Sequence, residues 1–303
     1  MVLVIGEILV DMIGKEENNV FLYERRAGGA PFNVASAINR LGGNSSFIGA
    51  VGNDLIGQFL LNYAQKMNFT YLDIAKLDDV NTTLAFVELD SHGERSFCFY
   101  RKNTADYKIA YPIKDFAKDA NIVHVGSLML SEKEGRDFIF KVINDAHKNN
   151  QLVSFDVNFR TDIFKDKDEA VNNYKKVIEL ADIVKFSEDE VDIFTKEYVD
   201  SLKDKLICVT LGSEGSLYKY NDLTNKVPSI KVNPVDTTGA GDAFFGALLY
   251  QLDGHNLKDL TKEFLDYAFR FANITGSLNT LGYGAIDNLP TKEKVLSLLN
   301  ERK

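Results

Sequence analysis

A run of small residues in the C-terminal third leads into a helical pattern and carries one carboxylate. Gly239, Ala240 and Gly241 stand directly before Asp242. Small residues let backbone N–H groups approach an anion, and the start of a helix adds positive charge there. A carboxylate beside a bound phosphate is useful mainly as the proton acceptor for an attacking alcohol. The run therefore predicts phosphoryl transfer with Asp242 as base; the plainer alternative is a turn in which Asp242 only supplies helix N-terminal charge.

Two familiar phosphate-binding motifs do not fit this run. The sequence has no GxxxxGK followed by Ser or Thr, and a dinucleotide fingerprint starting at Gly239 would need glycine where Phe244 stands. His92, His124, His147 and His255 are scattered, so they predict neither a metal cluster nor a nucleophile triad. The predicted anion site is of a different kind.

Composition excludes several classes of partner. The chain has 303 residues, of which 45% are hydrophobic and 26% are charged. Its net charge of −9 argues against nucleic acid and anionic membranes as partners.

No stretch approaches the roughly 20 apolar residues of a membrane span, and the N-terminus opens on a strand pattern without a basic leader, so we expect a cytoplasmic protein. Cys98 and Cys208 lie in strand-like runs and are expected in sheets, without a disulfide or a metal.

Alternating apolar runs and helical patterns dominate the chain from residue 105 onward. Strands are predicted at 121–127, 152–158, 182–187 and 206–212, with helices at 132–148 and 168–180. Ser131 and Glu134 predict a capping box for the first helix. Nearer the N-terminus, 30–41 and 54–67 read as helices flanking a strand at 45–51. Such repeats predict a parallel sheet with helices on both faces.

Two stretches break this rhythm. Residues 11–26 and 82–101 read as hairpins, the second turning at 90–93, and together they predict a small β-sheet lid. Apolar residues occupy both faces of the second hairpin, since Leu84 and Phe86 alternate with Ala85 and Val87. A sheet that is apolar on two sides needs two covers, which predicts a homodimer through the lid; a single-sided lid with exposed aromatics is the alternative.

The chain resembles the ribokinase-like, or PfkB-type, carbohydrate kinases over nearly its full length, and within them most closely the fructokinases. Two segments carry the family signatures, 27–54 upstream and 236–242 downstream. The fructokinase-like features between and before them are Gly6-Glu7 with Asp11, Gly93-Glu94-Arg95, Phe99-Tyr100-Arg101, Asp156-Val157-Asn158-Phe159-Arg160 and the segment 185–190. The resemblance implies a three-layer α/β fold in one domain, 1–303, with a lid at about 11–26 and 82–103.

The resemblance also implies transfer of the γ-phosphoryl of ATP to a sugar hydroxyl. Asp242 would deprotonate that hydroxyl, and the amides of Gly239, Ala240 and Gly241 would hold the developing charge. The positions that match sugar contacts in the family are Asp11, Gly28, Gly29, Asn33, Arg101, Asn158 and Arg160. Independently of the family, Asn158 and Arg160 follow a predicted buried strand, where the ligands of parallel sheets gather.

Nucleotide and metal sites are implied in the same way. The nucleotide would lie across Thr210, Gly212 and Gly215, with Lys185 and Asn273 nearby. Glu190 resembles the family's Mg²⁺ residue, acting through water, although Ser187 stands where many members have Asn. Potassium positions are matched by Asp236, Thr238 and Gly284. The run 279–283 departs from the commoner Thr-rich and basic pattern, which leaves potassium activation open.

Several functions compete with fructose phosphorylation. A 2-keto-3-deoxygluconate kinase shares the Asp-x-Asn-x-Arg element, and a ribokinase shares the base. A sugar phosphate is disfavoured as substrate, because Arg101 and Arg160 are the only basic residues placed for a second phosphate. From another class, a sugar-binding regulator without turnover would have no need of Asp242 as a base.

Overall fold

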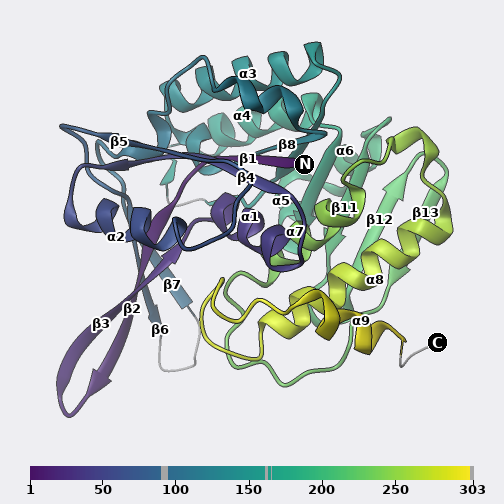
Figure 1. The fold of residues 1–303 in the computed structure, drawn as a ribbon. Helices are drawn as coiled ribbons and strands as arrows, with labels where there is room; N and C mark the ends of the chain where they lie inside the picture. The colour runs from purple at the N-terminus through teal and green to yellow at the C-terminus, as the bar shows by residue number, and fades with distance from the viewer. Residues whose placement is uncertain (90–94, 161–162, 165, 301–303) are drawn as a thin grey trace.

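The main body of the protein is one nine-stranded sheet between two helical layers (Figure 1). The structure is a computed structural model that describes residues 1–89, 95–160, 163–164 and 166–300. The strand order is β13-β12-β11-β10-β9-β8-β1-β4-β5, and seven strands from β11 to β5 run parallel. Its strands are β1 (Val2–Ile5), β4 (Ser45–Gly52), β5 (Leu72–Leu77), β8 (Ile122–Val125), β9 (Leu152–Asp156), β10 (Ile183–Ser187), β11 (Leu206–Thr210), β12 (Ser216–Tyr220) and β13 (Leu223–Val227).

The helices cover this sheet on both faces, as the sequence predicts. One hydrophobic cluster joins one face to α1, α7 and α8, and a second joins the other face to α3, α4 and α5. The described helices are α1 (Ala30–Arg40), α2 (Leu55–Ala64), α3 (Lys133–Lys148), α4 (Lys167–Leu180), α5 (Glu188–Phe194), α6 (Lys196–Ser201), α7 (Ala240–Leu252), α8 (Lys262–Asn279) and α9 (Lys292–Asn300). Among the described residues, no helix has the length and apolarity required to span a membrane.

A separate four-stranded sheet projects from the main body and forms the lid. Its order is β3-β2-β6-β7, with β2 (Leu9–Glu17), β3 (Val20–Gly28), β6 (Leu84–Leu89) and β7 (Arg95–Tyr100). Asp54 fastens the base of the lid to the main body. Its carboxylate caps α2 through Gly57 N–H and also accepts Thr82 N–H at 2.8 Å. The predicted turn at 90–93 lies outside the described residues.

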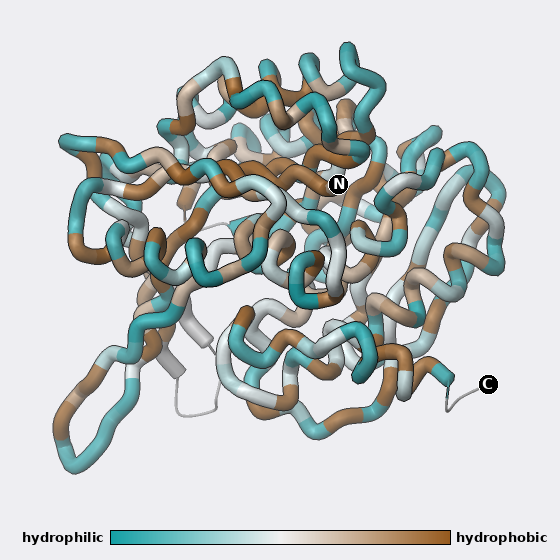
Figure 2. Tube along the Cα trace, viewed as in Figure 1, coloured by the Kyte–Doolittle hydropathy of each residue, from teal (hydrophilic) through white to brown (hydrophobic). Residues whose placement is uncertain are grey.

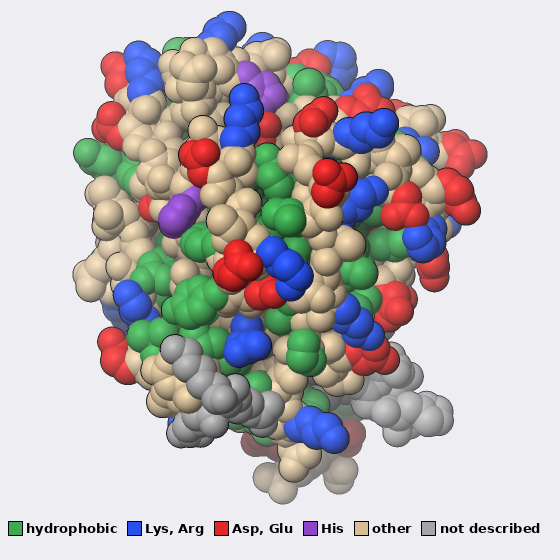
Figure 3. Space-filling view, turned by 90° about the vertical axis from the view of Figure 1, so that its right-hand side faces the viewer, with side chains coloured by type: hydrophobic (Ala, Val, Ile, Leu, Met, Phe, Trp, Pro, Cys, Tyr) green, Lys and Arg blue, Asp and Glu red, His purple; other side chains and the backbone are tan. Residues whose placement is uncertain are grey.

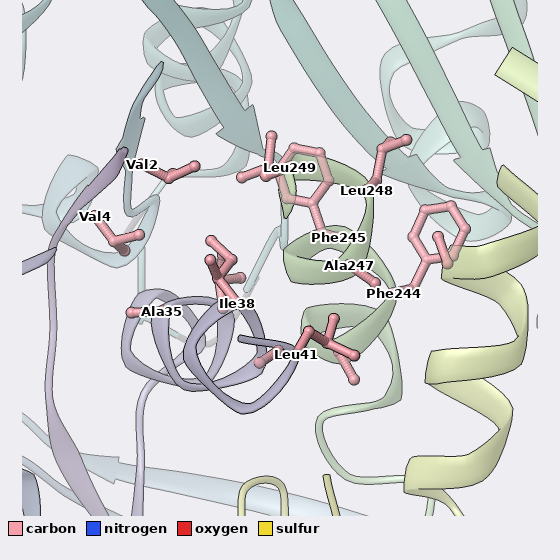
Figure 4. Close-up of a cluster of buried hydrophobic side chains, with 14 of the residues drawn as sticks. Val2, Val4, Ala35, Ile38, Leu41, Phe244, Phe245, Ala247, Leu248 and Leu249 are labelled. Carbon is pink, nitrogen blue, oxygen red and sulfur yellow. The ribbon is translucent and has the colours of Figure 1, made fainter. Parts of the chain in front are cut away.

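The core between α1 and α7 depends on one glycine. A Cβ at Gly246 would lie 2.7 Å from both the Ala37 Cβ and the Val34 carbonyl, so a side chain there would push the two helices apart. Ile38 and Phe245 belong to the apolar side chains that fill this region (Figure 4). This close approach sets the distance between the residues at the N-terminal ends of the two helices.

One local prediction was wrong, and one part of the main sheet was not predicted. Ser131 does not cap α3, because the N-cap residue is Glu132 and the Ser131 hydroxyl instead donates to the Leu128 carbonyl at 3.0 Å. The sheet also continues past β11 with β12 and β13, which run antiparallel. The Gly215 turn directly joins β11 to β12, and a two-residue turn joins β12 to β13, so no crossover helix intervenes.

Candidate active site

The N-terminus of α7 is the centre of the site. Gly239 is its N-cap in a left-handed conformation, φ 73°, and a Cβ there would lie 2.5 Å from the Ala285 Cβ. The conformation and the close contact both explain why glycine stands there. Asn33, in the first turn of α1, donates from Nδ2 to Asp242 Oδ2 at 2.8 Å. Packing of α1 on α7 therefore positions the predicted base.

A first cavity of about 500 Å³ opens on one side of this helix start. It lies at the carboxyl ends of β1, β8 and β9, the edge where parallel sheets bind ligands. Polar side chains reach this cavity from the lid, from the segments that follow β1, β8 and β9, and from α1 and α7. Its lining comprises Glu7, Leu9, Asp11, Gly29, Ala30, Asn33, Phe99, Ser127, Leu128, Asn158, Arg160, Thr237, Thr238, Gly239 and Asp242.

A second cavity, of about 580 Å³, opens on the other side of the same helix start. Ala240 and Gly241 line it, and Thr237 lines both cavities. The predicted nucleotide residues Thr210, Gly212, Gly215 and Asn273 all belong to its wall. The remaining lining residues are Ser213, Ser229, Ile230, Lys231, Val232, Asn233, Pro234, Phe244, Gly276, Ser277 and Thr280. Two ligands in these cavities would meet at the turn before Asp242.

Burial raises the pKa of Asp242 above its usual range, although Asn33, Lys185 and Arg160 act in the opposite direction. A carboxyl with a raised pKa is a stronger base once it is ionised. Lys185 and Arg160 act against this burial effect and favour the ionised form, which is the form of Asp242 that can accept a proton. This electrostatic setting fits the role predicted for Asp242 from the sequence.

Lys185 lies under the helix start and does not line the second cavity. Its Nζ is 2.8 Å from both carboxylate oxygens of Asp156, and both side chains are buried. Burial alone would lower the pKa of Lys185, but Asp156 and Glu190 raise it above its ordinary value. A Cβ placed on Gly241 would lie 3.4 Å from Nζ. The ammonium group is therefore next to the predicted phosphate-binding turn.

Glu190 is also buried and its carboxylate is already engaged. Oε1 accepts the Phe159 N–H at 2.6 Å, and Oε2 accepts the Ser187 N–H at 2.7 Å within a capping box for α5. Glu190 therefore fixes the segment that carries Asn158 and Arg160. Among the described residues, no group of three or more His, Cys, Asp or Glu is arranged to hold a metal directly.

The predicted potassium positions are brought together by hydrogen bonds. The carboxylate of Asp236 accepts the Thr238 N–H at 2.7 Å and the Gly284 N–H at 2.9 Å. The same loop is tied to the lid, because Arg26 in β3 donates to the Tyr283 carbonyl at 3.1 Å and to Asp287 at 2.8 Å. Asp236 thus joins the turn before α7 to a loop that the lid also contacts.

Most of the predicted sugar-contact residues meet at the first cavity. Asp11, Gly29, Asn33, Asn158 and Arg160 line it. Gly28 does not, but a Cβ there would lie 2.2 Å from Asp11 Oδ2, so the glycine makes room for that carboxylate.

Arg101 is the predicted sugar contact that is held away from the first cavity by other groups. It lies outside the first cavity, where its guanidinium pairs with the buried Asp106 at 2.6 Å and contacts Ser131. Asp106 also accepts hydrogen bonds from Thr83 and Thr104, so this cluster fastens the lid base.

Sequence reasoning assigned no role to several residues that line the cavities. Glu7 and Thr237 lie within motifs that carry the family resemblance, and their nearness to Asp11 and Gly239 was a usable signal. Ser127 and Leu128 follow a strand that was predicted correctly, so the strand end could have identified them. Phe244 and Ser277 come from helices whose relative placement depends on tertiary packing, which gives no local signal.

Comparisons with known proteins agree with this geometry. The model of the pfkB family of carbohydrate kinases matches residues 1–292. Fructokinase-1 of Oryza sativa subsp. japonica is 36% identical, covering 99% of this chain and 97% of its own. The fructokinase of Xylella fastidiosa, solved with bound ATP, superposes with a TM-score of 0.91 at 30% identity, covering 99% of this chain and 98% of its own.

A third relative was solved with ligands in two forms. Fructokinase of Vibrio cholerae O395 with fructose, ADP and calcium has a TM-score of 0.86 at 33% identity, covering 98% of each chain. A double mutant of it, with fructose, ADP and potassium, has a TM-score of 0.87 at 32% identity, covering 98% of this chain and 97% of its own. The resemblance inferred from the sequence motifs is confirmed: the chain belongs to the PfkB family of carbohydrate kinases.

Proposed function

We propose that this protein transfers the γ-phosphoryl group of ATP to a hydroxyl of fructose, giving fructose 6-phosphate. One observation carries the proposal: two cavities meet at the N-terminus of α7, with Asp242 on the first and Ala240 and Gly241 on the second. A sugar in the first and a nucleotide in the second would have their reacting groups at one turn. The relatives solved with fructose and ADP, or with ATP, support this assignment of the ligands.

In this reaction the chain would supply a base and an anion site. Asp242, held by Asn33, accepts the proton of the attacking hydroxyl as its oxygen approaches the γ-phosphorus. The backbone N–H groups of Gly239, Ala240 and Gly241 stabilise the charge that develops on the phosphoryl oxygens. The bond from the γ-phosphorus to its bridging oxygen then breaks, and ADP leaves. Arg160 on the cavity wall can contact the sugar or the transferring group.

We further propose that Mg²⁺ accompanies the nucleotide, held through water near Glu190. Buried carboxylates of Asp156, Glu190 and Asp242 gather around one lysine, so the local charge suits a divalent cation. Because both oxygens of Glu190 already accept backbone hydrogen bonds, contact through water fits better than direct ligation. When bound, Mg²⁺ would neutralise charge on the phosphates.

A potassium ion beside the anion site is a further part of the proposal. Asp236, Thr238 and Gly284 lie together at the loop that backs the turn before α7. The hydroxyl of Thr238 and Oδ1 of Asn279 are buried there without a hydrogen-bond partner among the described residues, which fits oxygen ligands for a cation. One Vibrio cholerae form contains potassium. Titrating activity with KCl at constant ionic strength, with NaCl as control, tests this part.

We propose that residues 1–303 act as one domain and that the lid excludes water during transfer. Leu9 and Asp11 of β2 and Phe99 of β7 line the first cavity, so two lid strands form part of the sugar site. Exclusion of water would suppress hydrolysis of ATP without a sugar. ATP turnover measured with and without sugar reports this directly. The expected place of the reaction is the cytoplasm.

The lid also supports a homodimer. Val20, Phe21, Leu22 and Tyr23 at the tip of the β2–β3 hairpin are 53%, 77%, 46% and 44% exposed. Figure 2 shows hydrophobic residues along this projecting hairpin. On the same lid, Phe86 contacts both Tyr23 and the exposed Tyr100, with ring centroids 5.1 Å apart in each pair. A second copy would cover this apolar surface.

The dimer is tested by sedimentation. We expect Phe21→Glu to convert a dimer to a monomer in analytical ultracentrifugation at micromolar concentration. The matched control is Tyr267→Glu, at a 43% exposed aromatic residue of α8, a helix on the opposite side of the molecule from the lid (Figure 1); it should leave the sedimentation coefficient unchanged. A parent protein that sediments as a monomer contradicts the homodimer.

Two experiments test the catalytic proposal: one varies the sugar substrate, and the other replaces the proposed base. ADP release should be measured with fructose, ribose and 2-keto-3-deoxygluconate, the substrates of the competing kinases. Asp242→Asn should bind sugar and ATP while kcat falls by about 10²- to 10⁴-fold. Near-parent turnover in this variant contradicts the mechanism. A parent that binds sugar but releases no ADP with any of the three substrates would favour the regulator.

A further inference from the structure

Glu7 is a buried carboxyl on the wall of the first cavity that the proposed reaction does not use. It follows β1, is 3% exposed, and lines the cavity. Its Oε2 has no hydrogen-bond partner among the described residues. Burying a polar oxygen without a partner is unfavourable, so such an atom on a ligand cavity marks a position where a ligand group can bond.

Glycines on two neighbouring segments leave room for Glu7, one beside its side chain and the other beside its backbone. A Cβ at Gly126, after β8, would lie 2.8 Å from Glu7 Oε2. A Cβ at Gly29, the N-cap of α1, would lie 2.6 Å from the Glu7 carbonyl. The carboxyl is therefore fitted into a confined place at the junction of the main sheet and the lid.

The surroundings favour the protonated form of Glu7. Burial is the main cause that raises its pKa to about 8; Asp106 and Asp242 add to it, while its own backbone N–H and Arg101 oppose it. Tyr174, whose hydroxyl donates to the Ser127 carbonyl at 3.5 Å, also interacts electrostatically with Glu7. At neutral pH most molecules thus carry a proton on Glu7, and a protonated carboxyl can donate a hydrogen bond as well as accept one.

We propose that Glu7 is a specificity-determining residue whose carboxyl donates a hydrogen bond to one hydroxyl oxygen of a neutral sugar, a hydroxyl other than the phosphorylated one. This rests on the proposed function, since it requires the sugar to occupy the first cavity. Oε2 provides the donor and the hydroxyl oxygen accepts. A sugar without that hydroxyl would leave the buried carboxyl unpaired, which is why the site would discriminate against it.

The proposal is tested by combining changes in Glu7 with the removal of single hydroxyls from the sugar. The parent, Glu7→Gln and Glu7→Met are assayed with fructose and with its monodeoxy analogues. We expect Glu7→Met to raise the KM for fructose on the order of tenfold, the effect of one hydrogen bond, with kcat and the KM for ATP nearly unchanged. One analogue should be poor for the parent but no worse than fructose for Glu7→Met. Glu7→Gln keeps a donor and should retain the parent's preference.

The pH dependence separates this role from a structural one. For the parent, the KM for fructose should rise as pH passes about 8, because Glu7 loses the donated proton. For Glu7→Gln it should stay flat over that interval. Tyr198→Phe, which removes another unpartnered buried oxygen far from the cavity lining, should leave all these values unchanged.

Two results overturn the proposal. One is an equal penalty for every analogue in parent and Glu7→Met, and the other is loss of thermal stability in both Glu7 variants without a change in sugar preference. A parent enzyme that phosphorylates no sugar would instead refute the proposed function.

Discussion

The buried pair of Lys185 and Asp156 is expected to dominate the stability of the region under the active site. Both side chains are less than a tenth exposed, and Nζ lies 2.8 Å from each carboxylate oxygen. Removing one member of such a pair leaves an uncompensated buried charge and costs about 3–5 kcal/mol. Removing both members costs much less, because no charge remains unpaired. Single and double variants should therefore differ strongly from additivity.

The neighbours of the pair predict an order between the single variants. Glu190 and Asp242 also interact with Lys185, so Lys185→Met leaves three buried carboxylates without their shared cation. Asp156→Leu leaves the lysine two acidic neighbours. We therefore expect Lys185→Met to be the more destabilising of the two, and Lys185→Met with Asp156→Leu to lie closer to the parent than either.

The magnitude can be converted into a melting temperature. Unfolding entropy of about 2.1 cal/mol/K per residue gives about 0.64 kcal/mol/K for 303 residues. A loss of 3–5 kcal/mol then lowers Tm by about 5–8 °C. The parent, the two single variants and the double variant form a double-mutant cycle. Calorimetry measures Tm for each of them, and urea titration provides a second measure of stability.

A pH series adds a signed test of the same reasoning. Burial raises the pKa of Asp156 and Glu190, so the folded state binds more protons than the unfolded state between their ordinary and raised values. Stability of Lys185→Met should accordingly increase as pH falls through that interval. The reasoning is refuted if the double variant loses the sum of the two single losses, or if Lys185→Met becomes less stable on mild acidification.

Three other outcomes are expected. The kcat/KM for sugar should rise with pH, and the midpoint of the rise should lie above the ordinary pKa of aspartate, because burial raises the pKa of Asp242. Only the ionised form of Asp242 accepts a proton. A midpoint at the ordinary pKa contradicts this. Gly28→Ala should raise the KM for sugar by displacing Asp11, whereas Gly42→Ala, whose Cβ meets nothing within 4 Å, should affect stability alone. Gly246→Val should cost about 1–3 kcal/mol and lower kcat by separating α1 from α7, as measured by urea unfolding and initial rates.

Local sequence signals predicted the fold well where an element buries one face in a regular pattern. The strands that became β8, β9, β10 and β11 were each placed within two residues of their ends. Local sequence signals did not predict features that depend on which distant residues a side chain or strand contacts in the folded protein. Ser131 had the spacing of a cap, yet Arg101 and the Leu128 carbonyl engage its hydroxyl instead. β12 and β13 are short, and polar residues on their partly exposed face weaken the pattern.

The site shows the same division. Asp242 and its turn could be selected as a candidate base and anion site because one short segment carries both the carboxylate and the small residues. The placement of Arg101 could not, because a buried acid five residues later, Asp106, holds it away from the first cavity. Over the face in Figure 3, acidic and basic side chains lie interspersed, which agrees with the prediction that phosphate is bound by a local site and not by a broad basic surface.

The bond between Asn33 and Asp242 spans 209 positions of the chain. A ribosome at a typical 5–20 residues per second needs roughly 10–40 seconds to make the second partner after the first has emerged. During that time α1 has no α7 against which to bury its apolar face. A nascent chain lacking α7 should thus be a substrate for chaperones, and catalytic competence should arise only near the end of synthesis.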